Sequence, residues 1–274
     1  MSVIIISSDD LTKGQHIAEK TAQDLGYRCL GREILATVAK EHDIPEETVI
    51  KTLDDAPTFL GMSSKTRNRY LACIQDTVLP LLVKDNVVCH GLMAQLYVLA
   101  VSHVLKVRIL SDQEALARQL AAQSHISPEK AAKILGRKIK QRQQWSLDAF
   151  SADVTDPSGY DLVIKLSQID ADRAVEIIKD TIADRRFQPM TYSIKRIMNV
   201  ALAIRIKALL IERFPDAKVE AVDGRVMVQT LALKRDKVKK ASAIKELVGQ
   251  VKGVTYVEVR IVNDFFRQAI ESFR

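Results

Sequence analysis

Apolar positions along the chain occur in two patterns, short continuous runs and longer stretches with helical spacing. The Ile-rich run at residues 3–7 is typical of a strand that is buried on both faces of a parallel sheet. Residues 15–25 carry apolar side chains at helical spacing, and Gly26 supplies the stop. The two patterns alternate as far as residue 182, so we expect an α/β fold with a mostly parallel sheet and flanking helices.

The other elements of this region follow from the same signals. The predicted strands are 27–30, 87–90, 104–110 and 160–166. The predicted helices are 32–40, 45–53, 63–84, 113–123, a long basic helix from residue 127 toward Trp145, and 171–182.

The pattern changes beyond Pro189. Asp223 and Gly224 form a strong hairpin signal between two alternating segments within residues 218–233. The predicted elements here are a helix at 194–214, two strands within 218–233, a helix at 237–251, a strand at 255–262 and a short amphipathic tail at 265–273. This αββαβ order predicts a small α+β domain at residues 191–274, after a larger domain at residues 1–187.

The composition of the 274 residues is 47% apolar, which is ample for two folded domains. Apolar runs fall far short of the roughly 20 residues that span a bilayer, so we expect no transmembrane segment. The first eight residues have no basic region before their apolar stretch and lead directly into Asp9 and Asp10. They lack the layout of a signal peptide, and we therefore expect a cytoplasmic protein.

The net charge of +7 belongs to the C-terminal third of the chain. Residues 185–274 hold 19 of the 41 Lys and Arg but only 9 of the 34 Asp and Glu. This charge predicts an anionic surface or a protein partner for the C-terminal domain, although a solvated basic helix face accounts for it equally well. Aromatic residues make up 5% of the chain and none interrupts the basic run at 234–240, so we do not expect nucleic-acid binding.

The segment after the first strand is the place where a nucleotide-binding protein of this class would hold phosphate. An intact phosphate loop has the pattern GxxxxGK[ST], whose backbone N–H groups surround the phosphate oxygens. Here residues 8–16 read SDDLTKGQH, and only Lys13 and Gly14 remain, in reversed order. Asp9 and Asp10 add negative charge next to this position, which argues against tight ATP binding.

Four segments together resemble the cytidylate-kinase-like family of P-loop nucleoside monophosphate kinases. IISSDDLTKGQHIAEKTAQDLGY, residues 5–27, is similar to the family's ISREYGSGGREIAxxLAExLGY, and LGREIL, residues 30–35, is similar to YDREIL. VVCHGLMAQLYVLAVSHVLKVRI, residues 87–109, resembles a strand, GRGA-type turn, helix and VLRVRI strand of the family. ISPEKAAKILGRKIKQRQQW and DPSGYDLVIKLSQI resemble its basic lid helix and its DPxxYDLVINTS strand.

The resemblance implies a P-loop kinase fold and site residues at the matching positions. ATP with Mg²⁺ is the implied cofactor, and a nucleotide is the implied ligand. No residue is assigned as a metal ligand. The cofactor-binding candidates are Thr12, Lys13 and Gly14; the catalytic candidates are Lys13, Arg137 and Arg142, with Lys138 also in the lid; the substrate-binding candidates are Arg32, Glu33 and His90.

Each candidate also has a purely structural interpretation. Lys13 could solvate a helix start, Arg32 could form a surface ion pair, and His90 could be a packed strand residue. Arg137 and Arg142 could lie on a solvated helix face.

The departures from the family pattern fall on the residues that carry its chemistry. The glycine-rich loop is replaced by residues 11–14, the Asp of the DREIL motif is Gly31, and the Arg of the GRGA turn is replaced near Gly91. Because phosphoryl transfer depends on positioning and charge neutralisation, these losses favour a nucleotide-binding or regulatory relic with weak or lost transfer. Two alternatives stay open: an active ATP-dependent CMP-type kinase, and an interaction protein that binds no nucleotide.

The C-terminal region resembles the BON domain family. AVDGRVMVQTLAL, residues 221–233, is similar to that family's V-x-DG-x-V-x-L-x-G strand pair, and GVTYVEVRIV, residues 253–262, is similar to its GVxxVxNxL ending. The resemblance implies an interaction module for phospholipid surfaces or hydrophobic ligands. The residues expected to meet an anionic surface are Lys234, Arg235, Lys237, Lys239 and Lys240.

Overall fold

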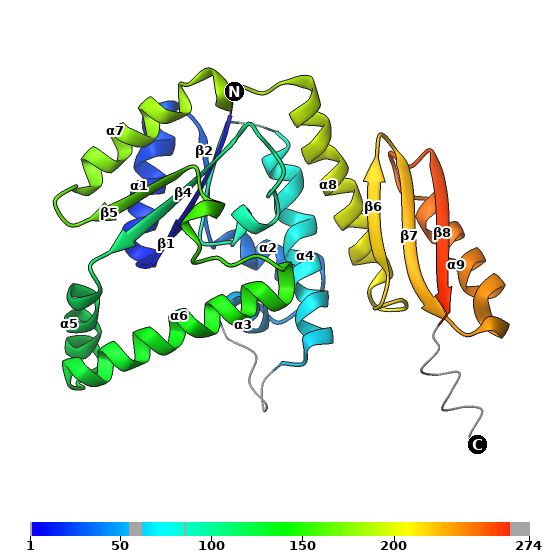
Figure 1. The fold of residues 1–274 in the computed structure, drawn as a ribbon, viewed down its shortest axis with the longest axis horizontal. Coiled ribbons are helices and arrows are strands. Elements are labelled where there is room, and N and C mark those ends of the chain that lie inside the picture. Colours follow the sequence, from blue (N-terminus) through cyan, green and yellow to red (C-terminus); the bar gives the residue numbers. More distant parts are fainter. Residues whose placement is uncertain (1, 55–61, 85, 264–274) are drawn as a thin grey trace.

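A computed structural model describes residues 2–54, 62–84 and 86–263 (Figure 1). Its strands are β1 Val3–Ser8, β2 Arg28–Leu30, β3 Val87–His90, β4 Val104–Ser111, β5 Leu162–Leu166, β6 Lys218–Val222, β7 Arg225–Ala232 and β8 Tyr256–Asn263. Its α-helices are α1 Leu11–Leu25, α2 Ile34–Glu41, α3 Glu46–Asp54, α4 Ser64–Leu82, α5 Gln113–Ser124, α6 Pro128–Phe150, α7 Ala171–Ile182, α8 Thr191–Leu210 and α9 Lys237–Gly249.

The first five strands form one parallel sheet in the order β2-β3-β1-β4-β5. The central strand, β1, pairs with β3 and β4, and Ile4 stands opposite Val88 on one side and Leu105 on the other. The carboxyl ends of all five strands therefore meet at one edge of the sheet. The predicted α/β fold with a parallel, helix-flanked sheet is confirmed.

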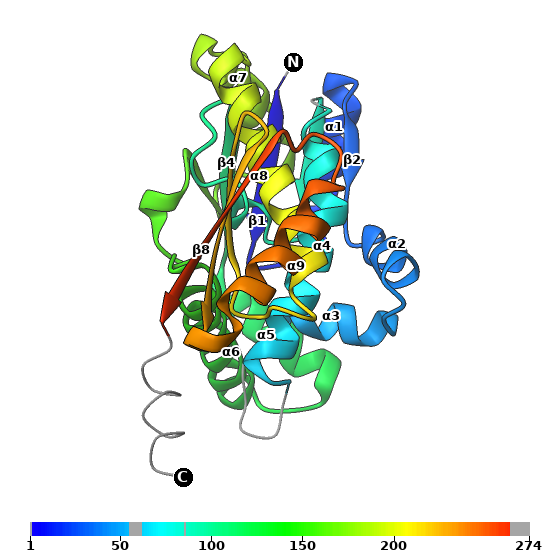
Figure 2. The same cartoon turned by 90° about the vertical axis from the view of Figure 1, so that its right-hand side faces the viewer.

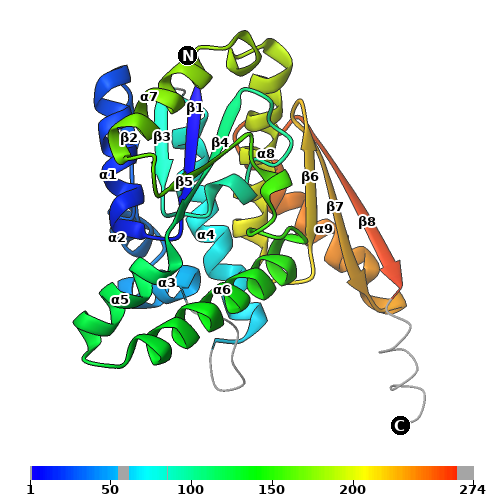
Figure 3. The same cartoon turned by 60° about the vertical axis from the view of Figure 1, so that its left-hand side comes forward.

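Alternating side chains of β1 bury both faces of this sheet. Val3 and Ile5 belong to a core shared with α2, α3 and α4, whereas Ile4 and Ile6 belong to a core shared with α1 and α7. Side chains that alternate in direction along a strand explain why a continuous Ile run suits a sheet covered on both sides. Figure 3 shows the sheet between these two helix layers.

Helix α6 crosses the carboxyl edge of the sheet (Figures 1 and 3). Ser127 begins it by accepting a hydrogen bond from the Lys130 N–H group at 3.3 Å, and Pro128 occupies its first turn. Trp145, near its end, is 2% exposed and packs edge-on against Phe150. This end of α6 is anchored in the main core, so the helix is held over the sheet edge.

The C-terminal region forms a second sheet of three strands, in the order β6-β7-β8. β6 and β7 are an antiparallel hairpin, and β8 runs parallel to β7. Asp223 and Gly224 form the turn with positive φ, as the hairpin signal predicts. Helices α8 and α9 bury one face through Ile206 and Ile244, and Figure 2 looks onto this side of the molecule. The predicted αββαβ order is confirmed.

Two sequence predictions differ from the structure or fall outside it. Helix α1 begins at Leu11 and not at residue 15, because the Asp10 side chain caps the helix four residues earlier than the apolar pattern indicates. Helix α4, by contrast, agrees with the helix predicted at 63–84, and it continues through Pro80. The tail predicted at 265–273 lies outside the described residues. In the described ranges, we find no helix with the length and apolar character needed to traverse a lipid bilayer.

Candidate functional site

The turn between β1 and α1 is closed by the side chain of Asp10. Its carboxylate accepts hydrogen bonds from the backbone N–H groups of Thr12 at 3.0 Å and Lys13 at 3.2 Å. Asp is favoured here because it satisfies N–H groups that have no partner inside the helix. The same groups, at the positive end of the helix dipole, are those that hold phosphate in other proteins. Asp10 therefore places a carboxylate where a bound anion would lie.

Gly14 lets the first turn of α1 lie against the ends of β1 and β3. A Cβ atom at Gly14 would lie 2.1 Å from Ser8 Oγ and 2.3 Å from His90 Nε2. The Ser8 hydroxyl donates to the Asp10 carbonyl at 2.8 Å, and its oxygen lies 2.8 Å from His90 Nε2. Because the single hydroxyl hydrogen goes to Asp10, His90 Nε2 is the donor in the second bond.

His90 is neutral in the folded protein. Burial, together with the positive charges of Arg142 and Arg32, lowers the pKa of its imidazole from 6.5 to about 4, while Glu19 acts in the opposite direction. The side chain is 4% exposed. A base with this pKa is poorly matched to proton transfer near pH 7. His90 therefore fixes Ser8 and the turn.

Asp9, the other acidic residue of the turn, is neutralised by Arg108 of β4. Arg108 Nη2 pairs with Asp9 Oδ1, and Arg108 Nη1 donates to Ser7 Oγ at 2.8 Å. The two charged side chains are 9% and 12% exposed. The expectation that Asp9 contributes uncompensated negative charge at this position is thereby corrected, since a buried arginine from the neighbouring strand balances it.

Arg142 reaches the same edge from α6. Its Nη2 donates to Met93 Sδ at 3.1 Å, and its buried Nε has no hydrogen-bond partner among the residues that the structure describes. Burial lowers the pKa of the guanidinium, and the charge of Arg108 adds to this effect. Arginine stays protonated in proteins, so a positive charge persists here. Within the described ranges Arg142 forms no ion pair, and a desolvated cation of this kind favours an anionic ligand.

Arg32 and Glu33 lie between β2 and α2, and the charge of Arg32 acts on His90. Arg32 Nη2 pairs with Asp54 Oδ2 at 2.8 Å. The Glu33 carboxylate accepts a hydrogen bond from the Gly31 N–H group at 2.7 Å. Glu33 thus stabilises its own turn, while Arg32 is held in place by an acidic residue at the end of α3.

The geometry therefore gathers three arginines and one neutral histidine at the carboxyl edge, where ligands bind in open α/β sheets. The sequence profile of the cytidylate kinase-like family matches residues 3–168, a range that holds β1 to β5 and the whole of this site. The chain belongs to the cytidylate kinase-like family. A search of curated proteins found no match.

Several solved structures are similar to this family member over about two thirds of its length. An uncharacterised protein from Eubacterium ventriosum is 20% identical, with 68% of this chain and 100% of that chain covered and a TM-score of 0.48. Shikimate kinase from Bacteroides thetaiotaomicron is 8% identical, with 66% and 98% covered and a TM-score of 0.43. Dephospho-CoA kinase from Campylobacter jejuni is 12% identical, with 65% and 96% covered and a TM-score of 0.35.

The candidates suggested by the family resemblance lie in different surroundings. Arg32 and Arg142 are both close enough to His90 to lower its pKa. Lys13 is half exposed, and its Nζ lies 3.9 Å from Asp10 Oδ2. Arg137, like Lys138, is exposed on the surface of α6. Of the two lid arginines, the structure therefore directs only Arg142 toward the sheet edge.

The residues of the β1–α1 turn do not fit a bound ATP–Mg²⁺ complex as they stand. The Thr12 and Lys13 N–H groups are already bonded to a carboxylate, and residues 11–14 form a helical turn in place of an open loop. A triphosphate could use these N–H groups only by displacing Asp10. The family's cofactor therefore needs either a rearrangement of this turn or a different mode of binding.

Arg108 is the site residue that the sequence did not single out. It lies at a buried position of β4, between Val107 and Ile109, where charged residues are rarely found without a partner. The available signal was a lone arginine inside an apolar strand next to an acidic turn. Its partner could not be known without the pairing of β1 with β4, which brings residues 99 positions apart into contact.

Proposed function

We propose that this family member binds a nucleotide or a related phosphate ester in a regulatory role, and that it transfers phosphoryl groups slowly or not at all. The observation that carries the proposal is the Asp10 carboxylate on the Thr12 and Lys13 N–H groups. A phosphate entering beside it would meet a like charge, which costs about 4 kcal/mol at about 4 Å and an effective dielectric near 20. The turn therefore disfavours a triphosphate donor.

Binding of a monophosphate is supported by the other half of the site. The Nε of Arg142 is buried and has no hydrogen-bond partner within the described part of the chain, and Arg32, which pairs with Asp54, lies near enough to His90 to lower its pKa. A guanidinium with a free N–H is suited to a phosphate oxygen, because charge-assisted hydrogen bonds are among the strongest in proteins. We therefore place the ligand's phosphate between Arg142 and Arg32.

Thermal unfolding with ATP, ADP, CMP and dCMP, each with and without Mg²⁺, tests binding, and a phosphoryl-transfer assay follows. We expect a saturable rise in Tm with a nucleoside monophosphate and no appreciable turnover. Turnover at about 1–100 per second would instead establish the CMP-type kinase that uses ATP and Mg²⁺. Absence of any nucleotide effect would favour an interaction protein.

Two variants of the same helix sharpen this test. Arg142→Met removes the desolvated guanidinium but keeps the length of the side chain, whereas Arg137→Met changes an exposed arginine on α6. We expect Arg142→Met to weaken monophosphate binding by at least about tenfold, since a charged hydrogen bond contributes about 1.5–3 kcal/mol. Equal binding of the monophosphate by both variants would show that Arg142 does not contact the ligand.

For the C-terminal αββαβ module we propose an interaction role of the BON type, with an anionic surface or a protein as partner, in a cytoplasmic protein. Its support is the element order and the basic helix start, where Lys239 is exposed. Lys240 is engaged internally, because its Nζ lies 3.1 Å from Asp216 Oδ1 and 2.7 Å from the Leu231 carbonyl. Co-sedimentation with anionic vesicles, together with cell fractionation, tests this proposal.

A further inference from the structure

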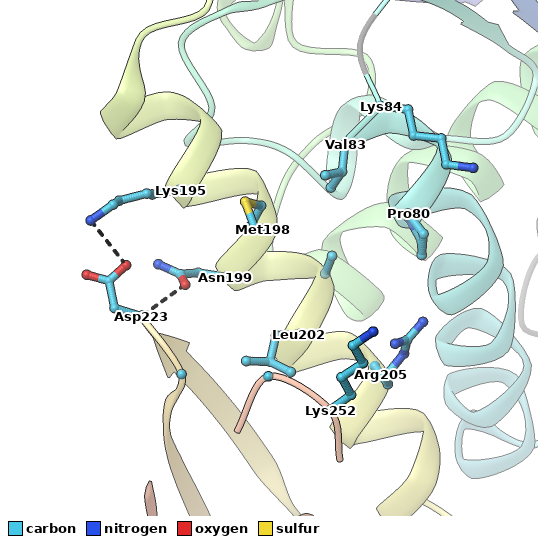
Figure 4. A pocket seen from close by; sticks show the side chains of 13 residues that line it. Pro80, Val83, Lys84, Lys195, Met198, Asn199, Leu202, Arg205, Asp223 and Lys252 are labelled. Atoms are coloured by element: carbon cyan, nitrogen blue, oxygen red, sulfur yellow. Dashed lines mark hydrogen bonds and ion pairs between the residues drawn. The ribbon is translucent and has the colours of Figure 1, made fainter. Parts of the chain in front are cut away.

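A pocket of about 620 Å³ lies between the end of α4, α8 and two turns of the C-terminal sheet (Figure 4). Its surface is largely apolar, and the apolar side chains come from two parts of the chain: Pro80, Val83, Met198, Ala201 and Leu202. The end of α4 leads into the amino end of β3, so the pocket lies away from the site at the carboxyl edge. It is a separate place on the molecule.

The walls of the pocket are fixed by backbone contacts. The Asp223 N–H group donates to Asn199 Oδ1 at 3.0 Å, which ties the β6–β7 turn to α8. The Thr255 N–H group donates to the Gly224 carbonyl at 2.8 Å, and a Cβ on Gly224 would lie 2.8 Å from the Gly253 carbonyl oxygen. Only glycine fits this close approach at positive φ. The hollow is therefore a defined feature of the fold.

The polar residues around the pocket leave an excess of positive charge. Lys195 pairs with Asp223 at 3.7 Å, and both lie at one end in Figure 4. Arg205 pairs with Asp76 at 3.6 Å. The other two cations, Lys84 and Lys252, are exposed and form no ion pair among the residues that the structure describes. One comes from the end of α4 and the other from the turn before β8.

We propose that this pocket binds an aliphatic carboxylate of about eight to twelve carbon atoms, a ligand suited to apolar pockets with a few polar groups. The hydrocarbon chain lies along Met198 and Leu202, and the carboxylate pairs with one of the two exposed lysines, Lys84 or Lys252. The ammonium group of a lysine is a compact point charge that can pair with a carboxylate. Because the ligand touches α4, α8 and the turn before β8, its binding holds the two sheets together.

Isothermal titration of the full chain tests the proposal with butyrate, octanoate and decanoate, kept below the concentrations at which they aggregate. Affinity should rise by about fourfold for each added methylene that is buried. Decanamide keeps the chain but lacks the charge, and it should bind at least about tenfold more weakly than decanoate. Absence of saturable decanoate binding, or equal binding of decanamide, would overturn the proposal.

Variants locate the binding on the molecule. Met198 is 53% exposed, so Met198→Asp places a carboxylate in the apolar wall without opening a core. This change, and separately the pair Lys84→Gln with Lys252→Gln, should weaken decanoate binding by at least about tenfold. Lys245→Gln, an exposed lysine of α9 outside the pocket, should leave it unchanged. Decanoate binding unaffected by Met198→Asp would place the ligand elsewhere and refute the assignment.

A diazirine derivative of decanoate gives an independent measurement on the unmodified protein. Cross-links should map to α8 and to the end of α4, and an excess of decanoate should suppress them. Labelling confined to other segments would also refute the assignment, even where a variant had failed to fold.

Discussion

Buried polar side chains at the carboxyl edge of the main sheet form two clusters of hydrogen bonds and ion pairs. Ser8 links the Asp10 carbonyl to His90, and Arg108 links Asp9 to Ser7. Each of these buried polar side chains would lower the stability of the fold if it were left without its partner. Substitutions here should therefore change stability as well as ligand binding.

The first prediction concerns the pH dependence that His90 gives to stability. Its pKa is lowered from 6.5 to about 4, so above pH 6.5 it is neutral in both the folded and the unfolded states. As the pH falls from 6.5 toward 4, the unfolded state gains a proton and the folded state does not. The free energy of unfolding should decrease over this interval by up to about 3 kcal/mol from this group.

Urea unfolding at several pH values measures this effect, and His90→Asn supplies the control. The decrease between pH 6.5 and 4 should be smaller in the variant than in the parent protein. A histidine resonance that titrates near 4 in NMR spectra, and is missing from the variant, should belong to His90. Identical pH dependence in the two proteins would contradict the prediction.

The second prediction concerns the buried ion pair. Arg108→Met leaves the Asp9 carboxylate buried without its partner, and we expect it to lower the free energy of unfolding by about 3–5 kcal/mol. Adding Asp9→Asn to this variant removes the charge and should recover part of the loss. Chemical denaturation of the parent protein, the two single variants and the double variant gives the coupling energy. A loss below about 1 kcal/mol in Arg108→Met, as for surface pairs, would be inconsistent with burial.

At the scale of single elements, helix α1 shows how one capping residue changes the turn between β1 and α1. Apolar periodicity predicts a helix from residue 15, but Asp10 starts it at Leu11 and converts the loop into a helical turn. Gly26 ends it in the left-handed conformation, at φ 67°. Both ends of this helix follow from local residues, while Gly14 allows its first turn to pack against Ser8 and His90.

The third prediction compares two helical glycines. Gly14→Ala would place Cβ 2.1 Å from Ser8 Oγ, so we expect a loss of about 1–3 kcal/mol through overpacking. Gly136→Ala, in α6, meets no atom of the described residues within 4 Å and should stabilise the protein by up to about 1 kcal/mol through helix propensity. Thermal and urea unfolding of both variants measure these opposite effects. Equal stability of the two variants would argue against close packing of Gly14 on Ser8 and His90.

At the scale of the whole molecule, α8 connects the two sheets by belonging to two cores. Ile197 packs in the core that includes α4, whereas Ile206 packs with β6, β7 and α9. Arg69 of α4 also pairs with Glu212, just beyond the end of α8. Figure 1 shows α8 between α4 and the C-terminal sheet. A helix shared in this way should couple the unfolding of the two parts.

The fourth prediction is a single calorimetric transition for the full chain. Ile197→Ala and Ile206→Ala each remove a fully buried side chain and should each cost about 2–5 kcal/mol. Because α8 joins both cores, each variant should lower the same Tm and leave one transition. A second transition, shifted by Ile206→Ala alone, would instead show that residues 1–187 and 191–274 unfold independently.

The sequence by itself determined the order and kind of the elements. The Ile run of β1 and the Asp223–Gly224 hairpin are local signals of strand burial and turn geometry, and the structure confirms them. Of the site candidates, His90, Arg32 and Arg142 came from the family resemblance. The match of the family's sequence profile to residues 3–168 then confirmed the family.

Only the tertiary structure decided how the site residues are partnered. Arg108 meets Asp9 across the β1–β4 pair, and Arg142 reaches the sheet edge while Arg137 does not. These contacts depend on strand order and on the direction of side chains from a helix that lies far away in sequence. Local patterns fix the conformation of a segment, but burial and charge pairing are properties of the assembled fold.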